Sequence, residues 1–505
     1  MDSTAVSSPI GRWVPRGSWV LPVMASALVF VAMALQRNYQ TDFWHHLARG
    51  RAIVEQGQLV DEDIFSYTVA GSPLRDANWL TQVLYFELFR RGGLMLVQVV
   101  NAVTLTAAFA LLVGLCARRC GSWRLAGFLG VFAFLTLWQL LIIRPQTFSL
   151  LLFVLLLLVL DRAEQHRRWL LLPPLILALW ANMHGGFPIG LLPVGGHLLA
   201  AAIDAGRSAG WRAVPGDHRV RDLGGCLGLC LLATLVNPYG WRVYEYVWTV
   251  SVMAAGRPIM EWAPPGVGLI VGKFFVLSVM LVLATFAWSP RRPSARELVL
   301  VLVFLPLASG AIRMVPWWLM VALPVAGAQL AAALPPRWLH DPADDQPSWV
   351  AASFLALVGL LGLLAALSLE PRLPIARWLQ RDHRLEDDLQ VVADQLLSRP
   401  RRSGHLFSRF EWGEYLGWAL APAGYRIFMD GRLEIYPSEV WDDYQRIRFG
   451  HADWQAKLDH YQVDFLVLDS DDPDLEYGLA PVVRRSPRWR LVAEQGPARL
   501  WERVP

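Results

Sequence analysis

The sequence predicts a mainly α-helical, polytopic membrane protein with about eleven spans and a small extracytoplasmic α/β domain at its C-terminal end. Hydrophobic residues make up 55% of the 505 residues and charged residues only 17%, whereas about a quarter of an average soluble chain is charged. The apolar residues come in blocks of roughly 15–23, close to the helix length that crosses a bilayer. From about residue 370, charges become frequent and apolar runs shorten to strand length, which is typical of a separate domain.

The membrane spans follow from these apolar blocks. The first block has no small-residue cleavage site behind it, so we expect a retained span rather than a removed signal peptide. The 24 Trp residues suit anchoring at the membrane interfaces. The expected spans are 19–36, 94–115, 125–143, 147–160, 169–182, 187–203, 222–236, 266–288, 297–311, 317–334 and 349–369.

The distribution of arginine predicts the orientation. Arginines crowd the N-terminal segment and every second loop, and the short alternate loops are nearly bare. The positive-inside rule then makes the N-terminus cytoplasmic and, with eleven spans, puts the C-terminal domain outside. We expect a multi-pass plasma (inner) membrane protein with a membrane domain over 1–369, a long first outer loop at 37–93, and an extracytoplasmic domain over 370–505. The arginines are Arg12, Arg16, Arg118, Arg119, Arg124, Arg162, Arg167, Arg168, Arg207, Arg212, Arg219, Arg221, Arg291, Arg292 and Arg296.

Charge and cysteine usage exclude two other classes of protein. The net charge of +4 is small and spread along the chain, which argues against nucleic acid as a partner. The four cysteines form two i, i+4 pairs, Cys116 with Cys120 and Cys226 with Cys230. This spacing is typical of helix packing and not of a zinc site.

The C-terminal domain has the pattern of a mixed fold. The runs "YRIFMDGR" and "VDFLVLDSD" predict buried strands that end in polar turns. The runs "EVWDDYQRI" and "DWQAKLDHY" predict helices, and "WRLVAEQGPARLWERV" predicts a closing hairpin with Gly-Pro at its turn.

The stretch "NYQTDFWHHLARG" follows the first expected span and holds Asp42, His45 and His46. Asp42 has two interpretations, because "TDFWHHLARG" looks like a helix start and an Asp there also serves as a cap. Successive residues on a helix point about 100° apart. We therefore expect at most one of the two histidines to support Asp42.

Glu261, in "MEWAPP", is an isolated acid near the end of a second long outer loop that is rich in aromatic residues. Three more ionisable residues interrupt otherwise apolar sequence at expected outer ends of spans: Arg144 in "IIRPQTF", His184 in "WANMHGGF" and Arg313 in "GAIRMVPWW". Such groups are costly at membrane depth and usually face a cavity or a partner. Alternatives remain. The arginines can snorkel to headgroups, His184 can cap a helix end, and Glu261 can be an ordinary loop acid.

These residues suggest a common chemistry, because all of them are expected on one side of the membrane. A carboxylate that removes a proton, together with arginines that hold a phosphate, is what glycosyl transfer from a lipid phosphate requires.

The arrangement resembles the GT-C superfamily of integral-membrane glycosyltransferases, which use polyprenyl-phosphate or pyrophosphate sugars. The resemblance rests on an Asp just after the first span, a long first outer loop, many spans and an outer C-terminal domain. The motifs "RPQTFS", "WANMHGG", "NPYGWRVY", "MEWAPP" and "FMDGRLEIYP" are similar to those of a poorly characterised bacterial branch. In the superfamily the first-loop acid is catalytic or helps to hold a metal, and Asp42 is the matching residue. The resemblance thus does not imply a definite cofactor, but it allows a bound divalent cation.

Two C-terminal motifs have double interpretations. "FEWGEYLGW", 410–418, is loosely similar to the WWDYG motif of oligosaccharyltransferases, but it is also a plain amphipathic helix. Asp430, Gly431 and Arg432 form either a tight turn with a salt link or an acceptor contact.

We expect a glycosyltransferase that is embedded in the lipid bilayer. It would move a sugar from a polyprenyl-phosphate carrier to an extracytoplasmic glycan, lipid or protein acceptor. Asp42 is the expected general base and Glu261 a second acid of the site. Arg144 and Arg313 are expected to hold the carrier phosphate, and His184 and Glu261 to orient acceptor or donor. His45 and His46 are expected in the substrate-binding site, where they can support Asp42. The alternative is a non-catalytic transporter or scaffold. A transporter should show paired broken spans in matching halves, and the sequence has no matching second pair.

Overall fold

A computed structural model of the chain describes residues 20–35, 42–255, 260–339, 349–367, 385–399, 403–470 and 478–504. It divides into two compact units. The first, here called the helical unit, comprises Met1–Gln36, Leu94–Trp241 and Arg257–Arg377. The second, here called the mixed unit, comprises Arg37–Gly93, Arg242–Gly256 and Trp378–Pro505. The boundary expected near residue 370 lies outside the described residues and stays a prediction.

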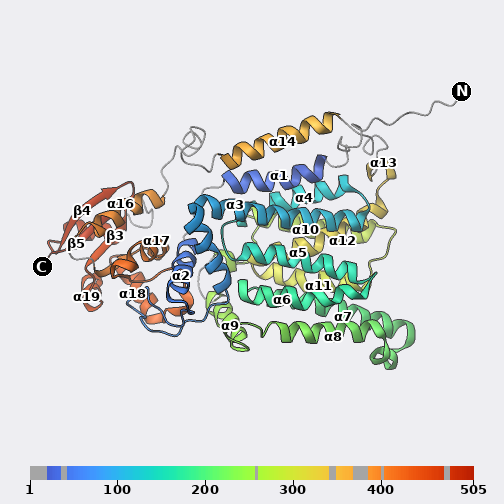
Figure 1. The fold of residues 1–505 in the computed structure, drawn as a ribbon, viewed down its shortest axis with the longest axis horizontal. Helices are drawn as coiled ribbons and strands as arrows, with labels where there is room; N and C mark the ends of the chain where they lie inside the picture. Colours follow the sequence, from blue (N-terminus) through green and yellow to red (C-terminus); the bar gives the residue numbers. More distant parts are fainter. Residues whose placement is uncertain are drawn as a thin grey trace. The chain divides into compact units, whose positions relative to one another are not determined.

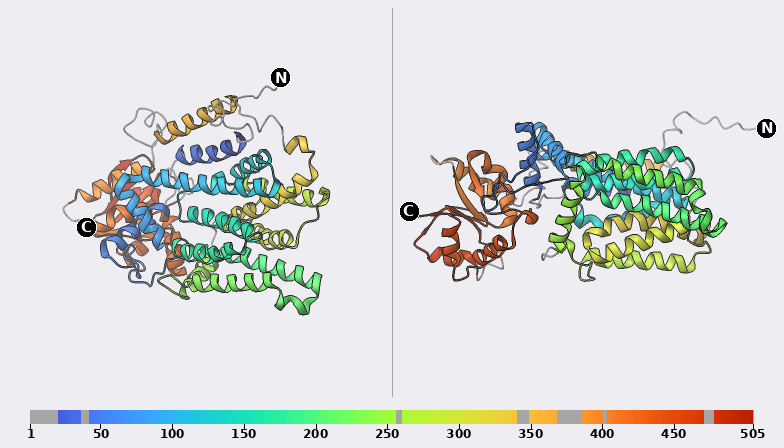
Figure 2. Two further views of the ribbon diagram at one scale, coloured as in Figure 1. Left: turned by 45° about the vertical axis from the view of Figure 1, so that its right-hand side comes forward. Right: turned by 90° about the horizontal axis from the view of Figure 1, so that it is seen from below.

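The helical unit is a bundle of roughly parallel helices (Figure 1), seen from two further sides in Figure 2. Its main helices are α1 (Val20–Leu35), the second part of α3 (Trp79–Cys120), α4 (Trp123–Leu137), α5 (Gln146–Ala163), α6 (Leu172–Met183), α7 (Pro188–Ala209), α8 (His218–Ala233), α10 (Ile270–Trp288), α11 (Ala295–Gly310), α12 (Val315–Ala333), α13 (Pro336–Leu339) and α14 (Trp349–Leu367). Short 3₁₀ turns join them: η3 (Trp138–Leu140), η4 (Arg167–Leu171), η5 (Trp211–Gly216), η6 (Met260–Trp262) and η7 (Ile312–Met314).

A helix lies at each of the eleven ranges expected as spans. Within the described residues, six helical stretches are long and apolar enough to cross a membrane: Trp79–Cys120, Trp123–Leu140, Gln146–Ala163, Pro188–Ala209, Ile270–Trp288 and Ile312–Ala333. Val20–Ala34 and Ala351–Gly362 are shorter apolar helices. The chain is thus mainly helical with six candidate spans, and the total of eleven stays a prediction.

Helix α12 forms the centre of the helical unit. It is buried along most of its length and contacts α4, α5, α10 and α11. An ideal Cβ on Gly327 would lie 2.9 Å from Cδ1 of Leu129, so a small residue is needed where α12 crosses α4. Trp318 of α12 donates its indole N–H to Oγ of Ser278 on α10 at 2.8 Å, which satisfies both buried polar groups.

The mixed unit contains a five-stranded sheet in the order β2-β1-β3-β5-β4. β1 (Gly404–Ser408) pairs in parallel with β2 (Tyr425–Ile427) and β3 (Phe465–Asp469), and β5 (Ala498–Arg503) pairs antiparallel with β3 and with β4 (Trp489–Gln495). The helices of this part are α16 (Leu385–Leu397), α17 (Phe410–Leu420), α18 (Ser438–Arg448), α19 (Trp454–His460) and α20 (Leu479–Arg485), with the 3₁₀ turns η9 (Ala421–Ala423) and η10 (Leu433–Ile435). The expected closing hairpin is confirmed, with Gly496 at its turn in a positive-φ conformation.

Residues 42–93, which the sequence predicts as the first outer segment and which keep that name below, belong to this same unit. The segment comprises α2 (Asp42–Gln56), a loop, and the start of α3, which is kinked at Gly92 and Gly93. Helix α2 packs against α17, and both helices are labelled in Figure 1. Ser66 forms a parallel bridge with Ile427, whose N–H donates to the Phe65 carbonyl at 3.1 Å. The segment therefore extends the edge of the sheet. The amphipathic α9 (Arg242–Ala255) also belongs to the mixed unit and contacts η10.

Candidate active site

Asp42 is the first residue of α2, close to two residues of the C-terminal part. An ideal Cβ on Gly431 would lie 3.6 Å from Oδ1 of Asp42 and 2.0 Å from Oε1 of Glu414. Oε1 of Glu414 accepts the Gly431 N–H at 3.1 Å. A larger residue at position 431 would displace the Glu414 carboxylate, whereas 3.6 Å from Asp42 is an ordinary contact distance.

The two histidines of α2 have different polar partners, although their ring centroids lie only 4.0 Å apart. His45 places Nδ1 3.4 Å from Oε2 of Glu414, and Nδ1 of His46 lies 3.1 Å from the Gln82 amide nitrogen. Burial lowers the pKa of His45 to about 4, although the nearby carboxylates of Asp430 and Asp42 act in the opposite direction. Burial thus favours the neutral form of the His45 ring, whose Nδ1 faces the Glu414 carboxylate.

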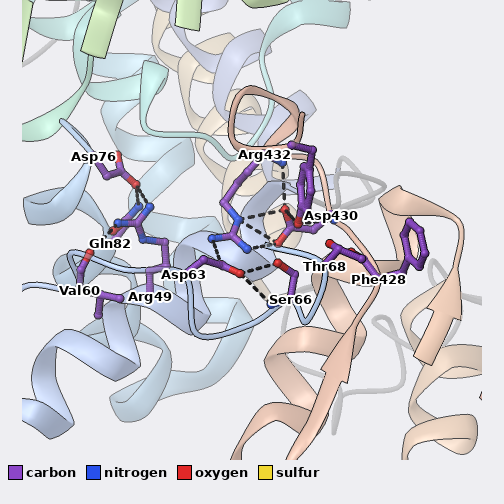
Figure 3. A network of polar contacts seen from close by, with 11 residues as sticks. Arg49, Val60, Asp63, Ser66, Thr68, Asp76, Gln82, Phe428, Asp430 and Arg432 are labelled. Carbon is purple, nitrogen blue, oxygen red and sulfur yellow. Dashed lines mark hydrogen bonds and ion pairs between the residues drawn. The ribbon is translucent and has the colours of Figure 1, made fainter. Parts of the chain in front are cut away.

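A buried arginine joins the first outer segment to the C-terminal part of the unit (Figure 3). Nη1 of Arg432 lies 2.7 Å from Oδ1 of Asp63, and its Nη2 lies 2.6 Å from Oδ2 of Asp430. Oδ2 of Asp63 also accepts the N–H of Ser66 at 2.9 Å. Burial alone would raise the pKa of Asp430, but the Arg432 guanidinium holds this pKa below its usual value. The Asp430–Arg432 salt link is thus present, and an acceptor contact stays a prediction.

A second buried network holds the loop after α2 (Figure 3). Nη1 of Arg49 lies 2.8 Å from Oδ2 of Asp76, which also accepts a hydrogen bond from the Gln82 amide. The same amide reaches His46. His46 therefore supports the segment through Gln82, next to the histidine that faces Glu414.

In the helical unit, the turn η6 brings Arg144 and Arg313 together. Arg144 makes an ion pair with Glu261, with Nη1 and Oε1 2.5 Å apart. The Arg313 guanidinium carbon lies 4.3 Å from the ring centroid of Trp262, the next residue of η6. The N–H of Ile312 donates to the Ala263 carbonyl at 2.9 Å, which fixes the two turns to each other. Both arginines thus have protein partners, and their contact with a carrier phosphate stays a prediction.

His184 ends α6 and lies against the first turns of α5. Its backbone N–H donates to the Trp180 carbonyl at 3.0 Å, so the helix-end interpretation is correct for its backbone. Its ring has a separate role, since Nδ1 lies 2.7 Å from Oγ of Ser149 and accepts the Gly186 N–H at 3.1 Å. Ser149 is on α5, which begins just after Arg144.

Comparison with known proteins decides what fold carries these groups. Protein-family models and curated proteins give no match, but solved structures do. The oligosaccharyltransferase AglB from Archaeoglobus fulgidus, in complex with an inhibitory peptide and a dolichol-phosphate, aligns with a TM-score of 0.57 at 12% identity over 89% of this chain and 69% of that chain. The apo form of the A. fulgidus enzyme aligns with a TM-score of 0.55 at 12% identity, over the same shares of both chains.

A third neighbour is the arabinofuranosyltransferase AftD from Mycobacteria, with a TM-score of 0.50 at 17% identity over 95% of this chain and 41% of that chain. These neighbours are GT-C glycosyltransferases. The chain has the GT-C fold. The resemblance found in the sequence is therefore confirmed at the level of the fold.

Two acids were missed by sequence reasoning, Glu414 and Glu434. Glu414 is fully buried on α17. The sequence signal that could have identified it is an acidic residue on the apolar side of an amphipathic helix. Glu434 is partly buried, and burial raises its pKa to about 7 against the opposing effect of Arg432. Among the described residues, no group of three or more His, Cys, Asp or Glu side chains is arranged to hold a metal ion. The possible divalent cation stays a prediction.

Proposed function

We propose that this chain is a membrane glycosyltransferase that moves a sugar from a polyprenyl-phosphate carrier to an extracytoplasmic glycan, lipid or protein acceptor. The observation that carries the proposal is the pair of arginines, Arg144 and Arg313, gathered on one turn of a GT-C fold. The dolichol-phosphate in the AglB complex supports a lipid phosphate as the donor class. An arginine can form two parallel charge-assisted hydrogen bonds to a phosphate, which are stronger than those it forms to a neutral group.

In the proposed reaction, Asp42 takes the proton of the acceptor hydroxyl. The acceptor oxygen then attacks the anomeric carbon, and the bond from that carbon to the carrier phosphate oxygen breaks. The carrier leaves as its phosphate, whose charge Arg144 and Arg313 stabilise. Glu261 keeps Arg144 in position through their ion pair, while Glu414 and His45 position the segment that carries Asp42.

The direct test is transfer by the purified full chain in liposomes that contain a polyprenyl-phosphate sugar with a labelled sugar. We expect the label to leave the lipid fraction and to appear on the acceptor. If the labelled sugar crosses the membrane but stays attached to its carrier, the protein is a transporter and the proposal is refuted.

The proposed topology has eleven spans, a cytoplasmic N-terminus and residues 370–505 outside the plasma membrane. Because the Arg-rich loops are predicted inside, a phosphatase fused after residue 505 should be active outside, and a fluorescent protein that folds only in the cytoplasm should stay dark there. The opposite pair of results would place the proposed site in the cytoplasm.

The two arginines should each contribute to donor binding. We expect Arg144→Ala and Arg313→Ala to weaken donor binding by about 10- to 100-fold, the effect of losing a hydrogen bond to a charged group. Lys should restore only part, since it lacks the planar fork. Arg167→Ala is a suitable control, because Arg167 is 79% exposed and 3.6 Å from its partner Asp222. Equal donor affinity in the control and both site variants would favour a purely structural role.

A further inference from the structure

Ser149 occupies the centre of a hydrogen-bonded chain of three side chains inside the helical unit. Its Oγ lies 2.6 Å from Nε1 of Trp180 and 2.7 Å from Nδ1 of His184. Ser149 and Trp180 are fully buried. An indole N–H can only donate, so Ser149 Oγ accepts from Trp180, and the single hydroxyl hydrogen is directed to His184.

A second donor meets the same ring nitrogen. The backbone N–H of Gly186 lies 3.1 Å from Nδ1 of His184, and a backbone N–H has no acceptor character. Gly186 approaches so closely that an ideal Cβ on it would lie 2.8 Å from Nδ1. Since a proton on Nδ1 would point at two donors, the ring proton is on Nε2.

We propose that Ser149 and Trp180 are positioning residues that fix His184 as an Nε2–H donor to an oxygen of the carrier phosphate. The inference rests on the proposed function, because it needs a phosphate at the end of α5. The peptide N–H of Thr147 at the start of α5 donates to the Arg144 carbonyl at 3.0 Å. Ser149 therefore lies about one and a half helical turns along the chain from the arginine expected to bind that phosphate. In this tautomer His184 donates a hydrogen bond and does not remove the acceptor proton, which leaves Asp42 as the base.

The helical unit supplies a matched control. Ser278 accepts the indole N–H of Trp318 at 2.8 Å, and both side chains are fully buried. The Ser278 hydroxyl, however, donates to the Phe275 carbonyl and not to a histidine. Ser278→Ala therefore breaks the same type of Trp–Ser contact without touching a ring.

The kinetic test compares donor KM and kcat for Ser149→Ala, Ser149→Thr, Ser278→Ala and wild type. Loss of one neutral hydrogen bond predicts a donor KM about two- to tenfold higher in Ser149→Ala. Ser149→Thr, which keeps the hydroxyl, should stay within about twofold of wild type. Trp180→Phe should raise donor KM in the same direction and Trp318→Phe should not. Equal KM values for Ser149→Ala and Ser278→Ala would overturn the inference.

The tautomer has its own readout. The full chain is labelled with ¹⁵N-histidine and its ring nitrogens are observed by NMR. The signals that are missing from the spectrum of His184→Gln are assigned to His184. We expect a protonated Nε2 and an unprotonated Nδ1 in wild type, and an increased share of the Nδ1–H form in Ser149→Ala. A wild-type ring protonated on Nδ1 would refute the inference even if transfer proceeds. Absence of transfer in wild type would instead contradict the proposed function, since the nitrogen signals do not depend on turnover.

Discussion

Asp42→Asn should abolish most sugar transfer while leaving the protein folded. The amide is nearly isosteric with the carboxylate but cannot take the acceptor proton, and general-base catalysis contributes roughly 10²–10⁴-fold to a rate. Asp42 opens α2, where a negative charge stabilises a helix by about 0.3–1 kcal/mol. We therefore expect a small change in thermal midpoint and a large loss of kcat, measured in liposomes with a labelled polyprenyl-phosphate sugar.

Asp61→Asn is the matched control for this variant. Asp61 is exposed in the same first outer segment, so the same substitution there removes a charge without removing a base. Transfer by Asp42→Asn at the rate of Asp61→Asn would exclude Asp42 as the base. The stretch at 42–50 would then be only a buried helix with a favourable charge at its start.

The positions of the helices were predictable from the sequence, for a physical reason. A chain segment in lipid must satisfy every backbone polar group internally, so each span is a continuous apolar run that can be recognised locally. The strand at "VDFLVLDSD" was predictable in the same way, because all five residues of β3 are buried. The hairpin that follows has its turn residues, Gly496 and Pro497, in adjacent positions.

The make-up of the mixed unit was not predictable. Asp63 and Arg432 are distant in sequence. Because an ion pair between them produces no periodic pattern in either segment, the sequence does not predict it. The expected domain bounds, 1–369 and 370–505, stay a prediction, and by its contacts the segment 37–93 groups with C-terminal residues. Glu414 was missed for the same reason, since its relation to His45 and Gly431 depends on how α17 packs against α2.

The site residues differ in what local sequence reveals. Arg144 and Arg313 were recognisable because each interrupts apolar sequence, where a charge is costly. Their common turn depends on Trp262 and on the Ile312–Ala263 hydrogen bond, which only the folded chain brings together. Ser149 gave no signal, since a single serine in an apolar helix usually bonds to its own backbone.

Arg432→Ala should strongly destabilise the mixed unit. The substitution leaves the carboxylates of Asp63 and Asp430 buried without their shared cation, and both side chains are at most 2% exposed. Removing one partner of a buried ion pair costs about 3–5 kcal/mol. We expect a clearly lower thermal midpoint by tryptophan fluorescence and rapid proteolysis within 403–504, with Arg432→Lys intermediate because it keeps the charge but not the fork.

Arg490→Ala separates this effect from the loss of any arginine in the same unit. Arg490 is 73% exposed and lies 2.9 Å from Glu502, and an exposed pair of this kind contributes about 0–1 kcal/mol. The destabilisation by Arg432→Ala should therefore exceed that by Arg490→Ala several-fold. Gly431, beside Asp42, is the residue before Arg432, so transfer by Arg432→Ala should also fall at temperatures where the fold persists. Similar midpoints for the two alanine variants would mean that Asp63 and Asp430 are not held as a charged pair around Arg432.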